Sequence, residues 1–236
     1  MSGSGHHGRR LRSPRATAAL AFALLIPLRA AALDPFEIQV YDGTANAAGV
    51  AGLELHLNYV PKGLAYVQGA LLPDGTFGYA GVKLRSKFVT PPGWREHLRL
   101  GVNLEVSHLP SSFDPSRWGA EVRPIVAWED DRFILAVNGN LGFALAGPDA
   151  WEGPELEPCA MAKVKVAGFA IGLEYYASLG SLGSFLPLAQ QEHDQFETID
   201  VLSLRGVELD AAVGEGLTSA SNPLVVKIIL GYSFGR

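Results

Sequence analysis

Side chains that could transfer protons in a catalytic centre are few in this 236-residue chain. Past residue 32 the histidines are His56, His97, His108 and His193. His56 lies two residues from Glu54, and such neighbours on a strand do not by themselves form the base and orienting group that activate a nucleophile. His108 stands near serines without a G-x-S-x-G motif, and His193 lacks the spacing of an H-E-x-x-H metal site. The sequence therefore predicts no catalytic residue, no metal and no cofactor.

Charged side chains recur at alternate positions within otherwise apolar segments. Because successive side chains of a strand point to opposite faces, these charges would share the face opposite to the leucines and valines. We expect the following residues on the charged face: Lys83, Arg85, Lys87, Arg99, Glu105, Glu121, Arg123, Lys163, Lys165, Glu174 and Glu208, with Glu54, Asp210 and Lys227 in the same pattern. An enclosed charge is costly unless it is paired or hydrated. The set predicts either a hydrated polar pathway or an interior filled by ion pairs.

The segments that would position these charges have the period of two that is typical of strands. Leu224–Phe234 shows it most plainly, with an apolar face that ends in two aromatics and a second face that carries Lys227 and Ser233. Eleven segments follow the pattern: 36–41, 53–59, 64–72, 77–89, 98–106, 118–128, 133–145, 160–166, 169–175, 198–213 and 224–234. No stretch has a convincing period of 3.6, so the chain is predicted to be all-β.

Composition agrees with many strands joined by turns. Charged residues make up 18% of the chain, which contains 27 glycines and 15 prolines. The net charge is −5 and no basic cluster follows residue 32, which argues against nucleic acid as a partner. Cys159 is the single cysteine, so no disulfide can form within the chain.

Residues 1–32 have the features of a secretory signal peptide. Arginines between positions 9 and 15 precede the apolar run 16–28, and Ala30 and Ala32 supply a small-x-small cleavage pattern. We expect cleavage near Ala32, which leaves residues 33–236 as one domain. An uncleaved membrane anchor is the alternative.

The strand pattern favours a membrane barrel over a soluble sandwich. The polar faces carry glycine, asparagine, serine and single charges, where solvated sheets usually carry more threonine, lysine and glutamate. Aromatics gather near the predicted strand ends, as in interfacial girdles: Tyr41, Tyr59, Trp94, Trp118, Trp128, Tyr175, Tyr232 and Phe234. We predict an antiparallel up-and-down transmembrane β-barrel of about ten to twelve strands in a bacterial outer membrane. Its partners would be outer-membrane lipid and, through Leu224–Phe234, the barrel-insertion machinery.

Several sequence runs carry a resemblance to a known family. The runs are DPFEIQVYDGTANAAGVAGLELHLNYV, DGTFGYAGVKLRSKFVTPPGW, LRLGVNLEVS, WGAEVRPIVAWED and RGVELDAAVGEGL. Together they resemble a poorly characterised family of proteobacterial outer-membrane proteins described as transporters or porin-like proteins. This chain departs from that family at Val60–Ala65, where relatives have extra strand-like sequence, and it continues to Gly235 and Arg236 after Phe234.

The resemblance and the charged face together imply a passive or substrate-selective diffusion pore for a small solute that the sequence does not identify. The cationic strip Lys83–Lys87 would attract anionic or aromatic solutes. The alternatives are a plugged structural or adhesive barrel and, less favoured, an outer-membrane hydrolase.

The strand count poses a problem of parity. Eleven strands are odd, whereas single-chain bacterial barrels close with an even number. A break of 198–213 at Arg205-Gly206 would give twelve, which we prefer. The alternative is the loss of one strand at Val60–Ala65, which would leave an unpaired seam.

Overall fold

The computed structural model describes residues 38–44, 51–59, 65–66, 69–71, 77–79, 81–91, 93–111, 116–148, 150, 153–204 and 206–234. Between residues 51 and 79 it describes the backbone alone. The predicted signal peptide and its cleavage site lie outside the described residues.

Ten strands of eight or more residues form the wall of the molecule. They are β1 (Ala51–Tyr59), β5 (Val82–Val89), β6 (Leu98–His108), β7 (Trp118–Glu129), β8 (Phe133–Ala146), β9 (Glu155–Val166), β10 (Phe169–Ser178), β13 (Glu192–Val201), β14 (Val207–Gly216) and β15 (Val225–Phe234). The shorter elements are β2 (Ala65–Tyr66), β3 (Gly69–Leu71), β4 (Phe77–Tyr79), β11 (Gly180–Ser181), β12 (Ser184–Phe185) and the 3₁₀ helix η1 (Leu188–Gln190). None of the helical structure within the described ranges is long and apolar enough to cross a membrane.

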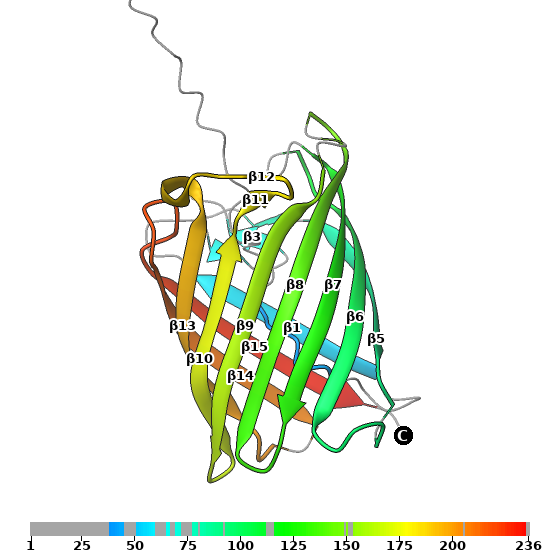
Figure 1. Cartoon of the computed structure of the whole chain (residues 1–236), viewed down its shortest axis with the longest axis vertical. Coiled ribbons are helices and arrows are strands. Elements are labelled where there is room, and N and C mark those ends of the chain that lie inside the picture. The colour runs from blue at the N-terminus through cyan, green and yellow to red at the C-terminus, as the bar shows by residue number, and fades with distance from the viewer. Residues whose placement is uncertain are drawn as a thin grey trace, which may run out of the picture.

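The strands form one antiparallel up-and-down sheet. Its order is β4-β3-β2-β1-β15-β14-β13-β10-β9-β8-β7-β6-β5. The last strand pairs with the first along its whole length, from Ala51 opposite Phe234 to Tyr59 opposite Val226. The sheet curls on itself, so that β1, β14 and β15 cross behind the wall formed by β13 to β5 (Figure 1). This confirms the predicted fold class.

The two ends of the sheet are not joined by strand pairing within the described residues. There β1 pairs with β2 only at Asn58 and Tyr59, and the sheet order ends at β4 and β5. Counted along the sheet order, β1 and β5 run in opposite directions.

The connections differ in length at the two ends of the sheet. Short turns join β7 to β8 and β9 to β10, and the second is a tight turn at Ala167 and Gly168, whose φ angles are 49° and 86°. Two positive φ values are typical of a type I′ hairpin. The longer connections, residues 109–117, 147–154, 179–191 and 217–224, lie at the opposite end, which we call the loop end. The end of β15 and the start of β1 both lie at the short-turn end.

The wall has the two faces that the period of two predicts. In β8, Ile134, Ala136 and Asn138 are buried toward the interior, whereas Leu135 and Val137 are exposed on the outer face. Large apolar side chains are exposed around the outer face: Val82, Leu84, Phe88, Leu104, Val106, Val126, Val164, Ile171, Leu173, Ile199, Val213 and Leu230. Trp118 and Tyr175 are exposed near the loop end and Tyr232 near the other end. Glu197 is an exposed carboxylate at mid-strand in β13.

Several predicted strand boundaries are wrong. Residues 38–41 form no strand, and the segment 64–72 supplies only the short β2 and β3. The segment 77–89 is interrupted before Gly81, whose φ of 123° suits glycine alone. The predicted break of 198–213 is confirmed, because β13 ends at Val201 and β14 begins at Val207.

Within the described residues ten strands have eight or more residues, which lies within the predicted range of ten to twelve and below the preferred total of twelve. β2 pairs with β1 and with β3 at only two residue pairs each, as the alternative of a lost strand predicted for this region. The division of 198–213 does not fit that alternative. Residues 60–64 lie outside the described residues.

Close packing of Phe196 against Gly214 provides a test of the interior. A Cβ at Gly214 would lie 2.5 and 2.6 Å from Cδ1 and Cζ of Phe196, whose ring is fully buried. We expect Gly214→Ala to lower the free energy of unfolding by about 1–3 kcal/mol through overpacking. Gly139→Ala is the control, because nothing lies within 4 Å of the Cβ that it adds. Equal urea midpoints for the two variants would contradict this packing.

Candidate functional site

Glu174 lies between two lysines in the interior of the sheet. Lys163 Nζ is 2.8 Å from Glu174 Oε1, and Lys227 Nζ is 2.5 Å from Glu174 Oε2. The Tyr176 hydroxyl donates a hydrogen bond of 2.6 Å to Glu174 Oε2. All four residues are buried. They come from β9, β10 and β15, so the contacts cross the lumen as well as neighbouring strands.

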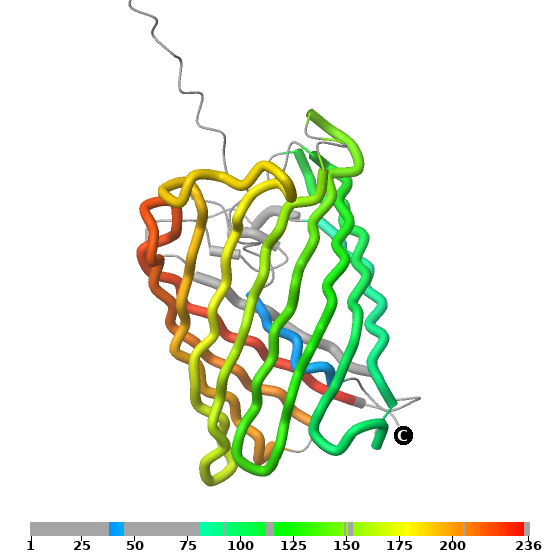
Figure 2. The backbone as a smooth tube through the Cα atoms, viewed as in Figure 1, coloured from blue at the N-terminus to red at the C-terminus, as the bar shows by residue number. Residues whose placement is uncertain are grey.

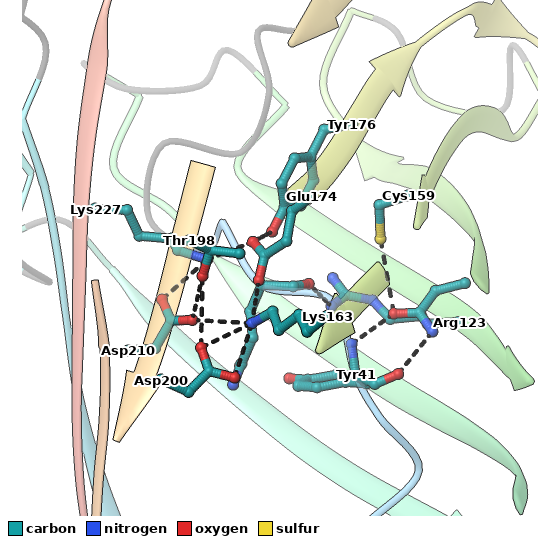
Figure 3. Close-up of polar contacts among 12 residues, drawn as sticks. Tyr41, Arg123, Cys159, Lys163, Glu174, Tyr176, Thr198, Asp200, Asp210 and Lys227 are labelled. Carbon is teal, nitrogen blue, oxygen red and sulfur yellow. Dashed lines mark hydrogen bonds and ion pairs between the residues drawn. The ribbon is translucent and has the colours of Figure 1, made fainter. Parts of the chain in front are cut away.

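Two aspartates complete this group, which we call the inner network (Figure 3). Lys163 Nζ is 2.8 Å from Asp200 Oδ1 and 3.2 Å from Asp210 Oδ2. Lys227 Nζ is 3.2 Å from Asp210 Oδ1. Thr198 Oγ1 donates to Asp210 Oδ2 at 3.1 Å.

Four of the five charged residues of the inner network are buried, and the side chain of Asp200 is 21% exposed. With every group ionised, two lysines and three carboxylates have a net charge of −1. Each lysine contacts at least two carboxylates, which is the condition under which buried charges are tolerated. The network therefore joins β9, β10, β14 and β15 through the lumen.

A second group surrounds the segment 38–44, which runs inside the sheet (Figure 2). Arg123 pairs with Glu121 through Nε–Oε1 and Nη2–Oε2 contacts of 2.8 and 3.0 Å. Arg123 also donates from Nη1 to the Gln39 carbonyl at 3.2 Å. Asn138 accepts a hydrogen bond from the Tyr41 N–H at 2.7 Å and donates to the Tyr41 carbonyl at 3.0 Å.

Two of the three cations of the predicted strip on β5 pair with one carboxylate of β6. Lys83 Nζ is 3.1 Å from Glu105 Oε1, and Arg85 pairs with the other Glu105 oxygen. Lys87 Nζ lies over the ring of Tyr41, 4.8 Å from its centroid. The three cations thus face inward as predicted, with Lys87 directed at the internal segment.

The remaining predicted charges lie toward the short-turn end. Arg99 and Lys165 both pair with Glu129, and Lys165 Nζ also donates to the Asp130 carbonyl at 2.9 Å. Glu208 has the inward register but is exposed near the start of β14. It lies at the mouth of the lumen instead of lining it.

The sequence missed three members of the inner network, Thr198, Asp200 and Tyr176. Residues 192–195 lie outside the predicted strand 198–213, although β13 begins at Glu192. Continuing the period of two through Asp194, Phe196 and Thr198 would have placed Asp200 on the inner face. Tyr41, predicted for an outer girdle, instead lies in the interior with 8% of its surface exposed.

The described histidines form aromatic contacts and hydrogen bonds. His97 and His108 lie 5.4 and 4.6 Å from the rings of Trp128 and Trp118. His193 Nδ1 is 2.5 Å from the Tyr175 hydroxyl. For His56 only the backbone is described. Among the described residues no group of three or more histidine, cysteine, aspartate or glutamate side chains could hold a metal ion.

Comparisons with known proteins identify similar solved structures. No family model matches the chain, and no curated protein matches it. The KdgM porin has a TM-score of 0.40 at 9% identity and covers 78% of this chain and 99% of its own. OprD from Pseudomonas aeruginosa has a TM-score of 0.39 at 11% identity and covers 82% of this chain and 67% of its own. These scores lie below 0.5, so the fold assignment depends on the strand pairing described above.

The bridging role of Glu174 can be tested against that of Glu129. Glu174→Gln leaves Lys227 with Asp210 as its one carboxylate partner in the inner network and removes the carboxylate that both lysines share, and we expect it to cost about 3 kcal/mol of unfolding free energy. Glu129 also contacts two cations, but its side chain is 21% exposed and those of its partners 35% and 22%, so Glu129→Gln should cost about 1 kcal/mol or less. Urea denaturation of both variants measures the difference. Similar losses would show that the inner network is no more important than the rim pairs.

Proposed function

We propose that this chain is a bacterial outer-membrane β-barrel whose polar lumen is a narrow, substrate-selective diffusion pathway for small solutes. The observation that carries this proposal is the separation of side chains across one wall. Apolar side chains are exposed on the outside, while lysine, arginine and carboxylate side chains face inward in pairs. A soluble sheet would present the opposite arrangement to water.

The outer face supports a position in lipid. Nine of the ten long strands have 9–14 residues, which meets the roughly 9–11 residues that a tilted transmembrane strand requires, and β5 with eight residues is one residue shorter. Exposed aromatics near both strand ends match the interfacial girdles of such barrels. Glu197 is an exception, and a carboxylate on the lipid face costs less than a cation there. The last strand, β15, would present Phe234 to the insertion machinery.

The lumen supports a pathway of small bore. Barrels of about eight strands are filled by side chains and those of 16–18 contain an aqueous channel, so ten long strands lie between these cases. The inward side chains of β5, β6 and β7 include four cations, Lys83, Arg85, Lys87 and Arg123. The same strands contribute two inward carboxylates that pair with them, Glu105 and Glu121. This part of the lining has an excess of positive charge, which favours anionic solutes.

A plugged structural or adhesive barrel is the second candidate. The observation that favours it is the degree of filling, because the inner network and the segment 38–44 both occupy the interior. Solute flux distinguishes the two candidates, since a plugged barrel conducts no ions.

The lipid-facing assignment predicts a depth-dependent cost of arginine. Val137 and Val166 are outward valines with similar exposure, 56% and 54%, but Val137 lies within β8 and Val166 ends β9 at the short-turn end. We expect Val137→Arg to reduce folding stability in bilayers by about 2–4 kcal/mol and Val166→Arg by about 1 kcal/mol or less. Equal losses, or full stability of both variants in aqueous buffer without lipid or detergent, would refute the membrane assignment.

The diffusion pathway predicts measurable ion currents. We expect the purified protein to produce small conductance steps in planar bilayers, with a preference for anions. Replacing Lys83, Arg85 and Lys87 together by glutamine should reduce that preference, measured as a shift of reversal potential in a salt gradient. Arg132→Gln, on an exposed turn, is the control. If folded protein produces no conductance steps, the structural barrel is favoured.

A further inference from the structure

A row of three hydrogen-bond donors crosses the inner face of β5, β6 and β7. Lys87 lies opposite Asn103 in one strand pair, and Asn103 lies opposite Arg123 in the next. Only 1% of the Asn103 surface is exposed, and its Nδ2 has no hydrogen-bond partner within the described part of the chain. A buried donor without an acceptor costs about 1–3 kcal/mol, so its retention calls for an explanation.

The ring of Tyr41 covers this row. Arg123 Cζ is 4.6 Å and Lys87 Nζ 4.8 Å from the centroid of the ring. Cations are attracted to the negative face of an aromatic ring, but the ring carbons supply no conventional acceptor, and Asn103 Nδ2 forms no hydrogen bond with Tyr41. Tyr41 therefore satisfies the two cations in part and leaves the third donor unsatisfied.

The segment that carries Tyr41 is attached differently from the strands of the wall. Residues 38–42 form no strand, and side chains of the wall hold their backbone: Asn138 through two hydrogen bonds and Arg123 through one. Ile38 and Val40, which belong to the same segment, are buried. Gly43, with φ of 73°, follows close to Arg99 and Ala127 near the short-turn end. Separating this segment breaks no strand pairing of the barrel.

We propose that Lys87, Asn103 and Arg123 form a binding site for small carboxylate or other anionic solutes, and that segment 38–44 is a displaceable plug whose Tyr41 ring covers it. A carboxylate has two acceptor oxygens and a negative charge, so it can accept from the Asn103 amide while contacting both cations. With Glu121 beside Arg123 the row retains a net charge of +1. This inference rests on the proposed function, because it places the site within the diffusion pathway.

Binding of a defined probe tests the site without any measurement of conduction. Benzoate is the probe, because it combines a ring with a carboxylate, and the neutral benzamide is the matched control ligand. By calorimetry on folded protein in detergent, we expect Tyr41→Ala to bind benzoate at least about tenfold more tightly than the unaltered chain, because the competing ring is gone. In that background Lys87→Gln and Asn103→Leu should each weaken binding about tenfold, and Arg132→Gln should not.

Asn103→Leu separates a ligand-binding role from a structural one. Removing an unsatisfied donor should leave the urea midpoint unchanged or raised while benzoate binding falls. A lowered midpoint with unchanged binding would overturn the site, as would equal binding of benzoate and benzamide.

Cys159 reports on the plug, because it is the single cysteine, is 2% exposed and lies 3.6 Å from Asn138 Oδ1. We expect Asn138→Ala to accelerate its reaction with a charged thiol reagent at least about tenfold. Asn140→Ala, an inward buried asparagine two positions away on β8, is the control. Equal labelling rates for these two variants would overturn the plug. If the protein produces no conductance in bilayers but binds benzoate and labels as expected, the diffusion pathway is refuted and the binding site is retained.

Discussion

The pairing of charges inside a curled sheet is the constraint on which most of this structure depends. The outer face of the wall is apolar, so the charged side chains of the strands must lie inside, where solvent cannot stabilise them. Lys163 and Lys227 are therefore surrounded by carboxylates from other strands. Such contacts add specificity to a sheet whose backbone hydrogen bonds alone would permit slips of register. The inner network thus has a structural role, because it connects β9, β10, β13, β14 and β15.

The two sides of the lumen differ in how completely they satisfy their polar groups. On the side of β9 to β15, each lysine has at least two carboxylate partners. Near β5 to β7, Asn103 retains an unsatisfied donor beside Lys87 and Arg123. In the first group the lysines and carboxylates form ion pairs with one another, and Asp210 Oδ1, which has no hydrogen-bond partner in the described part of the chain, lies 3.2 Å from Lys227 Nζ. The second group is better explained by an anionic ligand that takes the place of the Tyr41 ring.

The internal segment is one of three differences between the eleven predicted segments and the ten long strands. Residues 36–41 alternate apolar and polar types as a strand would but form none where they are described, 64–72 supplies only short strands, and 198–213 divides into β13 and β14. In the structure Ile38 to Asp42 lie inside the lumen, and the ten long strands place the beginning of β1 and the end of β15 at the same end. An even number of strands brings both termini of a barrel to one side, as the insertion of such proteins requires.

The sequence by itself determined which side chains of each wall strand face in and which face out. The period of two is a local property of the extended chain, so Leu104 could be assigned outward, with Asn103 and Glu105 inward, from their positions alone. Only the tertiary structure decided which inward groups meet. Lys163 and Asp210 are 47 residues apart, and Tyr41 and Asn138 are 97 apart. Segment 38–44 has the same local pattern as a strand, but its backbone is bonded to side chains of distant strands. Neither periodicity nor composition contains that information, because it depends on how the sheet curls and on the space that remains inside it.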